Sequence, residues 1–176
     1  MPLPLSTERL QVRVPRPDDL GFFVRMFADP EVTRYIARGE TWSEQRVREQ
    51  LDRKIAAQRE RGHTLYTVER RSDGRPVGDC GLAPWENGQI EIGWRFAREH
   101  WGNGLAREAA QAVFAHARDE LGISRLVCLV QEPNVASWRI AEGLGFRLDR
   151  TETWEGDRTV RIYSWAHTTS DHEDHP

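Results

Sequence analysis

The spacing of apolar and polar residues changes several times along the chain, and each change predicts a new element. From Thr7 to Val14 the two kinds of residue alternate, which is typical of a strand. Two amphipathic stretches follow, and both are predicted to be helices because their apolar residues recur every three or four positions. The first is capped by Asp18 or Asp19 and ends at Asp29-Pro30, and the second runs from Ser43 to Arg61 with Gly62 as its stop.

The middle of the chain is predicted to form an antiparallel meander of three strands. Short runs with strand character at Leu65–Arg71, Pro76–Leu82 and Gln89–Phe96 are separated by polar turns. The turns contain Asp73-Gly74 and Asn87-Gly88, pairs whose backbones accept the positive φ angles of type I′ turns. We therefore expect two tight hairpins here.

The last third of the chain alternates helix and strand. A helical period begins at Gly104, and the nearly all-apolar run Arg125–Gln131 is typical of a central strand covered on both faces. Asn134 begins another helix that ends near Gly143 or Gly145, and a hairpin from Phe146 to Ala166 follows. The whole pattern predicts an α/β (α+β) domain with a mixed, mostly antiparallel sheet of six to seven strands and helices on both faces.

A strand, a glycine-rich turn and a helix follow one another between Glu91 and Arg107. Gly102 and Gly104 lack a Cβ, so the backbone can take positive φ and a ligand can approach the amides closely. Those amides lie at a helix N-terminus, which favours anions such as a pyrophosphate. The loop has neither a Walker Gly-Lys-Ser/Thr nor a third glycine, so nucleotide hydrolysis is disfavoured. Two glycines alone are also typical of an ordinary tight turn.

Bulk composition narrows the function further. The net charge of −3 argues against a general nucleic-acid-binding protein, which needs surplus Lys and Arg. Cys80 and Cys128 stand far apart in strand-like runs, so we expect two reduced core thiols and a cytoplasmic protein. No apolar stretch is long enough to span a membrane, and no signal-peptide pattern is present. We expect residues 1–168 to form one domain and the polar residues 169–176 to be a disordered tail.

Four segments give the chain a family resemblance. They are the loop W-G-N-G-L-A at Trp101–Ala106, the run N-V-A-S-W-R-I-A-E-G-L-G-F at Asn134–Phe146, T-E-R-L at Thr7–Leu10 and A-D-P-E-V-T-R-Y-I at Ala28–Ile36. With the predicted element order, they resemble the GNAT N-acetyltransferase superfamily. Within it the chain is most similar to the Rim-type branch, which includes acetyltransferases of ribosomal-protein N-termini. The likeness covers nearly the whole chain.

The resemblance implies that acetyl-CoA is the co-substrate and that a splayed pair of central strands holds its pantetheine arm. Asn134 matches the family's side-chain contact to coenzyme A, although an asparagine at this point can equally be only a helix cap. Trp101 departs from the superfamily's Arg or Gln, so the loop amides should hold the phosphates. The expected cofactor-binding residues are Arg95, Phe96, Trp101, Gly102, Asn103, Gly104, Leu105, Ala106 and Asn134.

Catalysis of amine acetylation needs a base for the amine and a proton for the departing sulfur. Ser137 matches the family residue proposed to protonate the thiolate, though serine is also common in a first helical turn for structural reasons. Glu91 is our candidate base. One alternative is that Glu91 has only a structural role, either facing solvent or pairing with an arginine. The other is that ordered water carries the proton to bulk solvent. Backbone amides near Arg95 and Phe96 are candidates for stabilising the oxyanion.

Two classes of function follow from these residues. The first is an N-acetyltransferase that acts on a protein N-terminal α-amine or a small amine by direct attack in a ternary complex. The second is a non-catalytic acyl-CoA-binding module. The acceptor should lie between the segments Thr33–Trp42 and Trp154–Arg158, with Trp42, Trp85 and Trp154 as candidate lining residues. No metal-ligating constellation is evident, and the resemblance leaves homodimerisation open.

Overall fold

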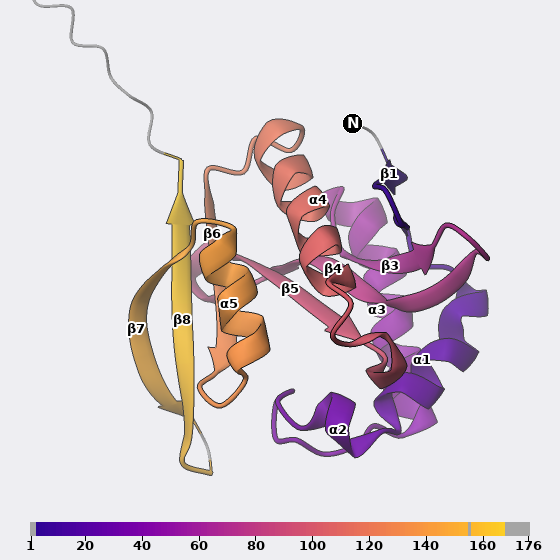
Figure 1. Cartoon of the computed structure of the whole chain (residues 1–176), viewed down its shortest axis with the longest axis horizontal. Coiled ribbons are helices and arrows are strands. Elements are labelled where there is room, and N and C mark those ends of the chain that lie inside the picture. Colours follow the sequence, from indigo (N-terminus) through magenta and orange to yellow (C-terminus); the bar gives the residue numbers. More distant parts are fainter. Residues whose placement is uncertain (1–2, 155, 168–176) are drawn as a thin grey trace, which may run out of the picture.

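A computed structural model describes residues 3–154 and 156–167, so the predicted polar tail lies outside the described residues. Eight strands form one sheet in the order β1-β2-β3-β4-β5-β6-β8-β7 (Figure 1). The strands are β1 (Leu5–Ser6), β2 (Leu10–Arg13), β3 (Leu65–Arg70), β4 (Arg75–Pro84), β5 (Ile90–Phe96), β6 (Arg125–Gln131), β7 (Arg147–Trp154) and β8 (Arg158–Ala166). The α/β class is confirmed, with one strand more than expected.

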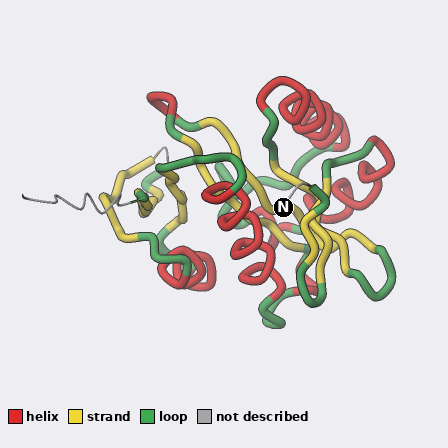
Figure 2. Tube along the Cα trace, turned by 90° about the horizontal axis from the view of Figure 1, so that it is seen from above, coloured by secondary structure: helices red, strands yellow, loops and turns green. Residues whose placement is uncertain are grey.

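The helices are α1 (Leu20–Phe27), α2 (Pro30–Thr33), α3 (Glu44–Arg61), α4 (Leu105–Asp119) and α5 (Val135–Gly143), with short 3-10 turns at Pro17–Asp19, Glu86–Gly88 and Arg98–His100. Helices α4 and α5 pack on one face of the sheet, and α1 and α3 cover the other (Figures 1 and 2). Two separate apolar clusters result, one on each face. Within the described residues, no helix is both long and apolar enough to cross a membrane.

The extra strand, β1, lies before the predicted strand Thr7–Val14, of which only Leu10–Arg13 forms β2. The Thr7 backbone N–H donates to the Leu10 carbonyl at 2.9 Å, and the Leu10 N–H donates to Thr7 Oγ1 at 2.9 Å. This turn separates β1 from β2, which pair antiparallel with each other. The hydroxyl of Thr7 thus competes successfully with the strand ladder.

Helix α3 begins and ends as predicted. Ser43 Oγ accepts a hydrogen bond from the Arg46 N–H at 3.2 Å, and Gly62 closes the helix with φ of 76°. Asp19, one of the two predicted residues, is the N-cap residue of the first helix, but its side chain makes no cap hydrogen bond to α1. Instead the buried Asp19 carboxylate binds the Arg13 guanidinium at 2.7 and 2.9 Å. The charge-assisted hydrogen bonds between Asp19 and Arg13 are stronger than a hydrogen bond from an uncharged helix N–H group.

One of the two predicted type I′ hairpins is present. Asn87 and Gly88 have φ of 56° and 76°, as that turn requires. At the β3–β4 connection only Gly74 has positive φ, so the type I′ prediction is wrong there. The Gly74 N–H closes a wider turn onto the Arg70 carbonyl at 2.8 Å, and Asp73 Oδ1 accepts from Arg70 Nε at 3.1 Å.

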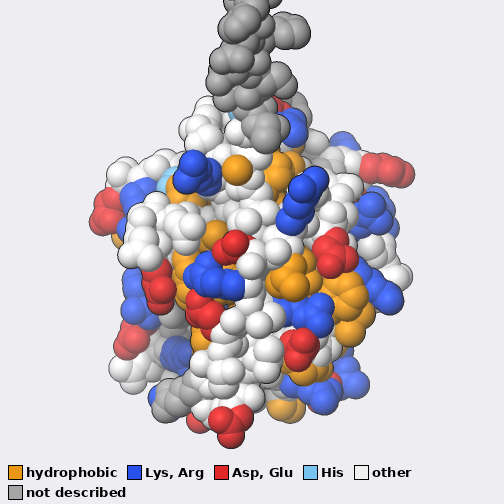
Figure 3. All heavy atoms as spheres, turned by 90° about the vertical axis from the view of Figure 1, so that its left-hand side faces the viewer, with side chains coloured by type: hydrophobic (Ala, Val, Ile, Leu, Met, Phe, Trp, Pro, Cys, Tyr) orange, Lys and Arg blue, Asp and Glu red, His pale blue; other side chains and the backbone are white. Residues whose placement is uncertain are grey.

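The outer side of the sheet edge formed by β7 and β8 carries many charged side chains. Figure 3 shows acidic and basic side chains interspersed with apolar ones over this face. Several of them are paired, including Arg150 with Glu152 at 2.8 Å and Arg161 with Glu132 at 2.9 Å. Such pairs keep an exposed sheet edge from offering a large apolar surface.

Strands β5 and β6 are parallel neighbours that separate soon after they meet. Their register contains a single pair, Glu91 with Val127, whereas β4 stays paired with β5 as far as Phe96. The half of β5 beyond Glu91 is therefore unpaired on the β6 side. The expected splayed pair of central strands is present, and it leaves backbone groups free for a bound extended chain.

Candidate functional site

A cavity of about 830 Å³ occupies the gap between β5 and β6. Its walls include all but one of the expected cofactor-binding and catalytic residues, namely Glu91, Arg95, Phe96, Trp101, Gly102, Gly104, Leu105, Ala106, Asn134 and Ser137. The exception is Asn103, which is not among the lining residues. Sequence positions more than forty residues apart therefore meet in one site.

The cavity passes from one face of the sheet to the other. Ile92, Trp94 and Phe96 belong to the cluster under α4 and α5, so the alternating side chains of Glu91 and Arg95 point to the α1–α3 face. The glycine loop and the start of α5 lie on the α4–α5 side (Figure 1). A ligand held by the loop can thus reach Glu91 only through the gap between the strands.

The loop before α4 is built to receive a ligand. Gly102 and Gly104 have φ of 76° and 75°, and Gly104 is the residue that caps α4. A Cβ added at Gly102 would meet nothing within 4 Å, so no described protein atom fills the space beside its Cα. Together with the four unpaired N–H groups of the first helical turn, this geometry fits a pyrophosphate.

Trp101 has a structural contact that the sequence did not reveal. Its indole Nε1–H donates to the Phe96 carbonyl at 2.8 Å, which ties the glycine loop to the last residue of β5. Where the superfamily has an Arg or Gln, this chain has a tryptophan whose polar N–H group is bound within the protein. The expectation that the loop amides, rather than a side chain at this position, hold the phosphates therefore stays a prediction.

The T-E-R-L segment fixes the same loop from the other end of the chain. Arg9 Nη1 donates to the Asn103 carbonyl at 2.8 Å, and Arg9 Nε donates to Glu108 Oε2 at 2.7 Å. Thr7 Oγ1 donates to Glu108 Oε1 at 2.6 Å. The sequence indicates only the family resemblance of this segment, and it carries no signal for the contacts of Thr7 and Arg9 with Glu108 and Asn103. Asn103 thus serves through its backbone rather than its side chain.

Glu91 has the electrostatics of a base that works near neutral pH. Burial raises the pKa of its carboxyl to about 7, and the Arg95 charge only partly opposes this shift. The alternative that Glu91 pairs with an arginine is not observed among the described residues, because Arg95 binds Asp79 instead. Its position in the cavity wall also differs from that of an ordinary solvent-facing carboxylate.

A buried ion network supports the wall that carries Glu91. The fully buried Asp79 accepts from Arg95 Nε at 2.9 Å, from Arg95 Nη2 at 2.6 Å and from Lys54 Nζ at 2.6 Å. Although burial raises the pKa of Asp79, the two cations outweigh it and hold the pKa below its usual range. Burial lowers the pKa of Lys54. Arg95 is therefore fixed at the cavity wall by an anion behind it.

The start of α5 supports both interpretations of Asn134. Its Oδ1 accepts from the Ser137 N–H at 3.4 Å, so it does cap the helix. That bond is long, and Asn134 and Ser137 both line the cavity on the side of the glycine loop. Within the described residues, the Ser137 hydroxyl has no protein hydrogen-bond partner, which leaves it available to a ligand.

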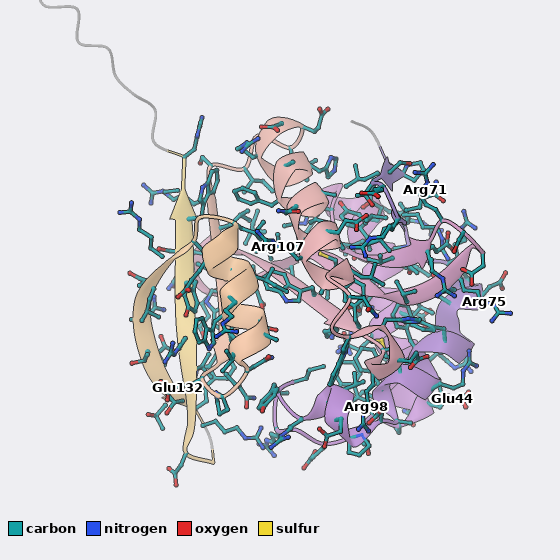
Figure 4. All side chains as sticks on the ribbon, in the orientation of Figure 1. Glu44, Arg71, Arg75, Arg98, Arg107 and Glu132 are labelled. Atoms are coloured by element: carbon teal, nitrogen blue, oxygen red, sulfur yellow. The ribbon has the colours of Figure 1, made fainter. Side chains whose placement is uncertain are left out.

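Arg107 is a cavity residue that was not predicted. It belongs to the first turn of α4 and lies between α4 and α5 (Figure 4). Its Nη2 would be 3.8 Å from a Cβ at Gly143, an ordinary contact distance, so the guanidinium lies against the end of α5. A cation beside the loop suits an anionic ligand.

The far end of the cavity is aromatic, and two segments close it as expected. Trp85 and Trp154 stack with their ring centroids 5.8 Å apart and their planes at 17°. Arg158 donates to the carbonyls of Ala37 and Arg38, which joins the last hairpin to the loop after α2.

Trp42 does not line this end, and its prediction is corrected. Its ring stacks on Phe27 with centroids 4.2 Å apart, in the core between α1 and α3. The apolar interior on that face accommodates a ring that the sequence alone had placed near the acceptor.

Comparison with known proteins agrees with the geometry. Residues 9–147 match the family model described as acetyltransferase (GNAT) domain. The uncharacterized protein YkkB of Bacillus subtilis strain 168 is 32% identical over 164 residues, which are 90% of this chain and 93% of YkkB.

Two solved structures share the fold. A GNAT-family acetyltransferase from Bacillus anthracis superposes with a TM-score of 0.81 and 23% identity, over 92% of this chain and 97% of that one. RimL, a ribosomal L7/L12 α-N-protein acetyltransferase solved with coenzyme A, gives a TM-score of 0.78 and 18% identity, over 91% and 95% of the two chains. Since the family model spans most of the sequence, this chain belongs to the GNAT acetyltransferase family and is an N-acetyltransferase.

Proposed function

We propose that the protein transfers an acetyl group from acetyl-CoA to a primary amine by direct attack in a ternary complex. The observation that carries this proposal is the single cavity that joins the glycine loop to Glu91 through the gap between β5 and β6. A cofactor held on one face and an amine arriving from the other would meet in that gap. The fold shared with RimL, solved with coenzyme A, supports the choice of donor.

Each part of the cavity has a task in this reaction. The amides from Gly102 to Ala106 would hold the pyrophosphate, with Arg107 beside them. The unpaired half of β5 would bind the pantetheine arm as an added strand. On the opposite face, Glu91 would take a proton from the amine, since its pKa of about 7 keeps it ionised at slightly alkaline pH while the substrate ammonium is still protonated.

The cysteines favour direct attack over an acyl-enzyme. Cys80 and Cys128 are both buried, and burial raises the pKa of each thiol well above its ordinary value. A thiol in that state is a poor nucleophile, because the thiolate is the reactive form. Ser137, at the start of α5, is better suited to donate a proton to the departing sulfur than to form a covalent intermediate.

Two measurements test the proposal together. Calorimetry should detect coenzyme A binding to the purified protein, and thiol release from acetyl-CoA should depend on an added primary amine. Binding without amine-dependent release over a broad amine panel would favour an acyl-CoA-binding module. Absence of coenzyme A binding would contradict the assignment of the loop.

A further inference from the structure

We propose that the acceptor is a small primary amine with an aromatic or other apolar body and no carboxylate next to the amine. This inference rests on the proposed function, because it concerns the side of the cavity from which the amine would approach Glu91. Three observations carry it: the chemistry of the walls, the charges that face them and the contacts that close the far end.

The walls of the acceptor half are apolar and aromatic. On the α1–α3 side of the sheet the lining residues, apart from the charged ones, are Val32, Tyr35, Ile36, Ala37, Leu65, Ala83, Trp85, Leu129, Gln131, Trp154 and Val160. The stacked pair Trp85 and Trp154 presents indole rings beside this space. Such rings bury a large apolar area, and their faces attract an ammonium group while disfavouring a carboxylate.

The charges on this side do not favour an acceptor carboxylate. Of the three charged lining residues on this side, Glu31 and Glu91 are acids, and Glu31 is paired with the exposed Arg34 at 3.5 Å, which leaves Glu91 as the acid without such a partner among the described residues. The third is Arg95, whose Nε and Nη2 are both bound to Asp79. The carboxylate of an amino acid would therefore lie near an acidic side chain and aromatic ring faces, which disfavour it. The one arginine on this side is already paired with Asp79. An amine without that group meets no such repulsion.

The far end of the cavity is bridged in a way that limits the size of the acceptor. Gln131 Nε2 on β6 donates to the Ala37 carbonyl at 3.0 Å, and Arg158 on β8 donates to the carbonyls of Ala37 and Arg38. These bonds connect two walls that are about a hundred residues apart in the sequence. A peptide whose chain left the site on this side would have to break this bridge, whereas a small amine would leave it intact.

A panel of matched amines tests the class of acceptor. It comprises 2-phenylethylamine, phenylalanine, phenylalanine amide and a decapeptide that begins with phenylalanine, each assayed by thiol release from acetyl-CoA and compared per unprotonated amine. We expect 2-phenylethylamine and the amide to react. Phenylalanine and the decapeptide should each show a kcat/KM lower by roughly tenfold or more. The carboxylate of phenylalanine is repelled by the acids of the cavity, and the decapeptide has to open the bridge.

Three variants assign the effect to the named residues. Trp154→Ala should raise the KM for 2-phenylethylamine, Trp154→Phe should largely restore it, and neither should change coenzyme A affinity. Thr153→Ala is the matched control, because the side chain before Trp154 points to the opposite face of β7. Arg158→Ala removes the bridge and should raise the kcat/KM of the decapeptide relative to that of 2-phenylethylamine.

The outcomes separate the two proposals. Equal or better use of phenylalanine or of the decapeptide by the wild-type protein overturns the acceptor assignment and leaves the acetyltransferase activity standing. An unaltered KM in Trp154→Ala also overturns it. If no primary amine promotes thiol release although coenzyme A binds, the proposed function fails and the acceptor assignment fails with it.

Discussion

Arg9 and Glu108 are joined at two points, although they lie 99 residues apart in the sequence: the Arg9 N–H donates to Oε1 at 2.8 Å and Arg9 Nε donates to Oε2 at 2.7 Å. The pair lies beside the glycine loop, because Arg9 also binds the Asn103 carbonyl. Glu108 stands in the first turn of α4, where a carboxylate is favoured by the helix dipole. The N-terminal segment therefore fixes the loop that we propose as the phosphate site.

Removing this contact should weaken cofactor binding without touching the cofactor directly. We expect Arg9→Ala to lower coenzyme A affinity by up to about 1.5–3 kcal/mol, the range of hydrogen bonds to charged groups, and calorimetry measures it. Arg48→Ala is the control, since that exposed arginine pairs with Glu44 on α3 and changes the net charge equally. Equal affinities for the Arg9 and Arg48 variants would show that the contact does not shape the loop.

Gly104→Val should abolish coenzyme A binding while the domain stays folded. The substitution puts a β-branched residue at φ of 75°, which costs roughly 1–2 kcal/mol or more, and it places a side chain beside the amides. Gly62→Val is the matched control, because Gly62 has φ of 76°, open space around its Cβ and a position at the end of α3. Comparable coenzyme A affinities of the two variants would show that the glycine loop is not part of the coenzyme A site.

The sequence predicted the features that depend on contacts between residues a few positions apart in a regular element, and it did not predict those that depend on other contacts. Ser43 and Gly62 mark their helix through contacts within four residues, and such local signals were interpreted correctly. The contact between Arg9 and Glu108 has no local pattern, and neither does the salt bridge by which Arg13 takes the Asp19 side chain from its expected cap hydrogen bond. The first contact exists only once segments 99 residues apart are brought together, whereas the second joins residues six apart and follows no helix or strand period.

The candidate site shows the same division. The cavity lining agrees with the predicted loop and with Glu91 and Ser137, because motif spacing places them on known kinds of element. Arg107 was missed because an arginine on a helix carries no signal of the groove that it faces. Trp42 was misplaced because a tryptophan suits a core and a binding site equally well, and only its stacking on Phe27 decides between them.

The Glu91→Gln substitution should change the pH dependence of the reaction. In the wild type, kcat/KM should rise up to about pH 7, where Glu91 ionises, and then level off. The variant should instead keep rising as more free amine forms in solution, so its deficit is greatest near and below neutral pH and shrinks at high pH. Superimposable pH–rate profiles would return Glu91 to an ordinary strand carboxylate, with water carrying the proton.

The same substitution should stabilise the fold at alkaline pH. The pKa of Glu91 is raised in the folded state, so the folded protein binds more protons than the unfolded chain between pH 4.5 and about pH 7, and its stability falls as pH rises through this window. Glutamine removes this penalty, which is at most roughly 3 kcal/mol. Denaturant unfolding should show a gain at pH 8 and none at pH 4; a gain of equal size at both would exclude this origin.

Asp79→Asn should destabilise the protein strongly. The substitution leaves the Lys54 and Arg95 charges without their buried anion, and losses of this kind are about 3–5 kcal/mol. Because the folded pKa of Asp79 is depressed, its contribution is present above the unfolded pKa and is lost as pH falls further. Asp73→Asn, which removes an exposed acid, is the control for denaturant unfolding and should change little. A small loss in Asp79→Asn would mean that the two cations find other partners.

Ser137→Ala should lower kcat and leave the KM for acetyl-CoA nearly unchanged. Ser137 and Glu91 line the cavity from opposite faces of the sheet, so the hydroxyl is placed for the sulfur rather than for the amine. General acids and bases typically contribute ~10²–10⁴-fold, and a coenzyme A thiolate already leaves well, so we expect a loss at or below the lower end of that range. Steady-state kinetics with Arg139→Ala as a control on the same helix measure this effect. A raised KM with unchanged kcat would make Ser137 a binding residue, and no change in either would leave it as part of the first turn of α5.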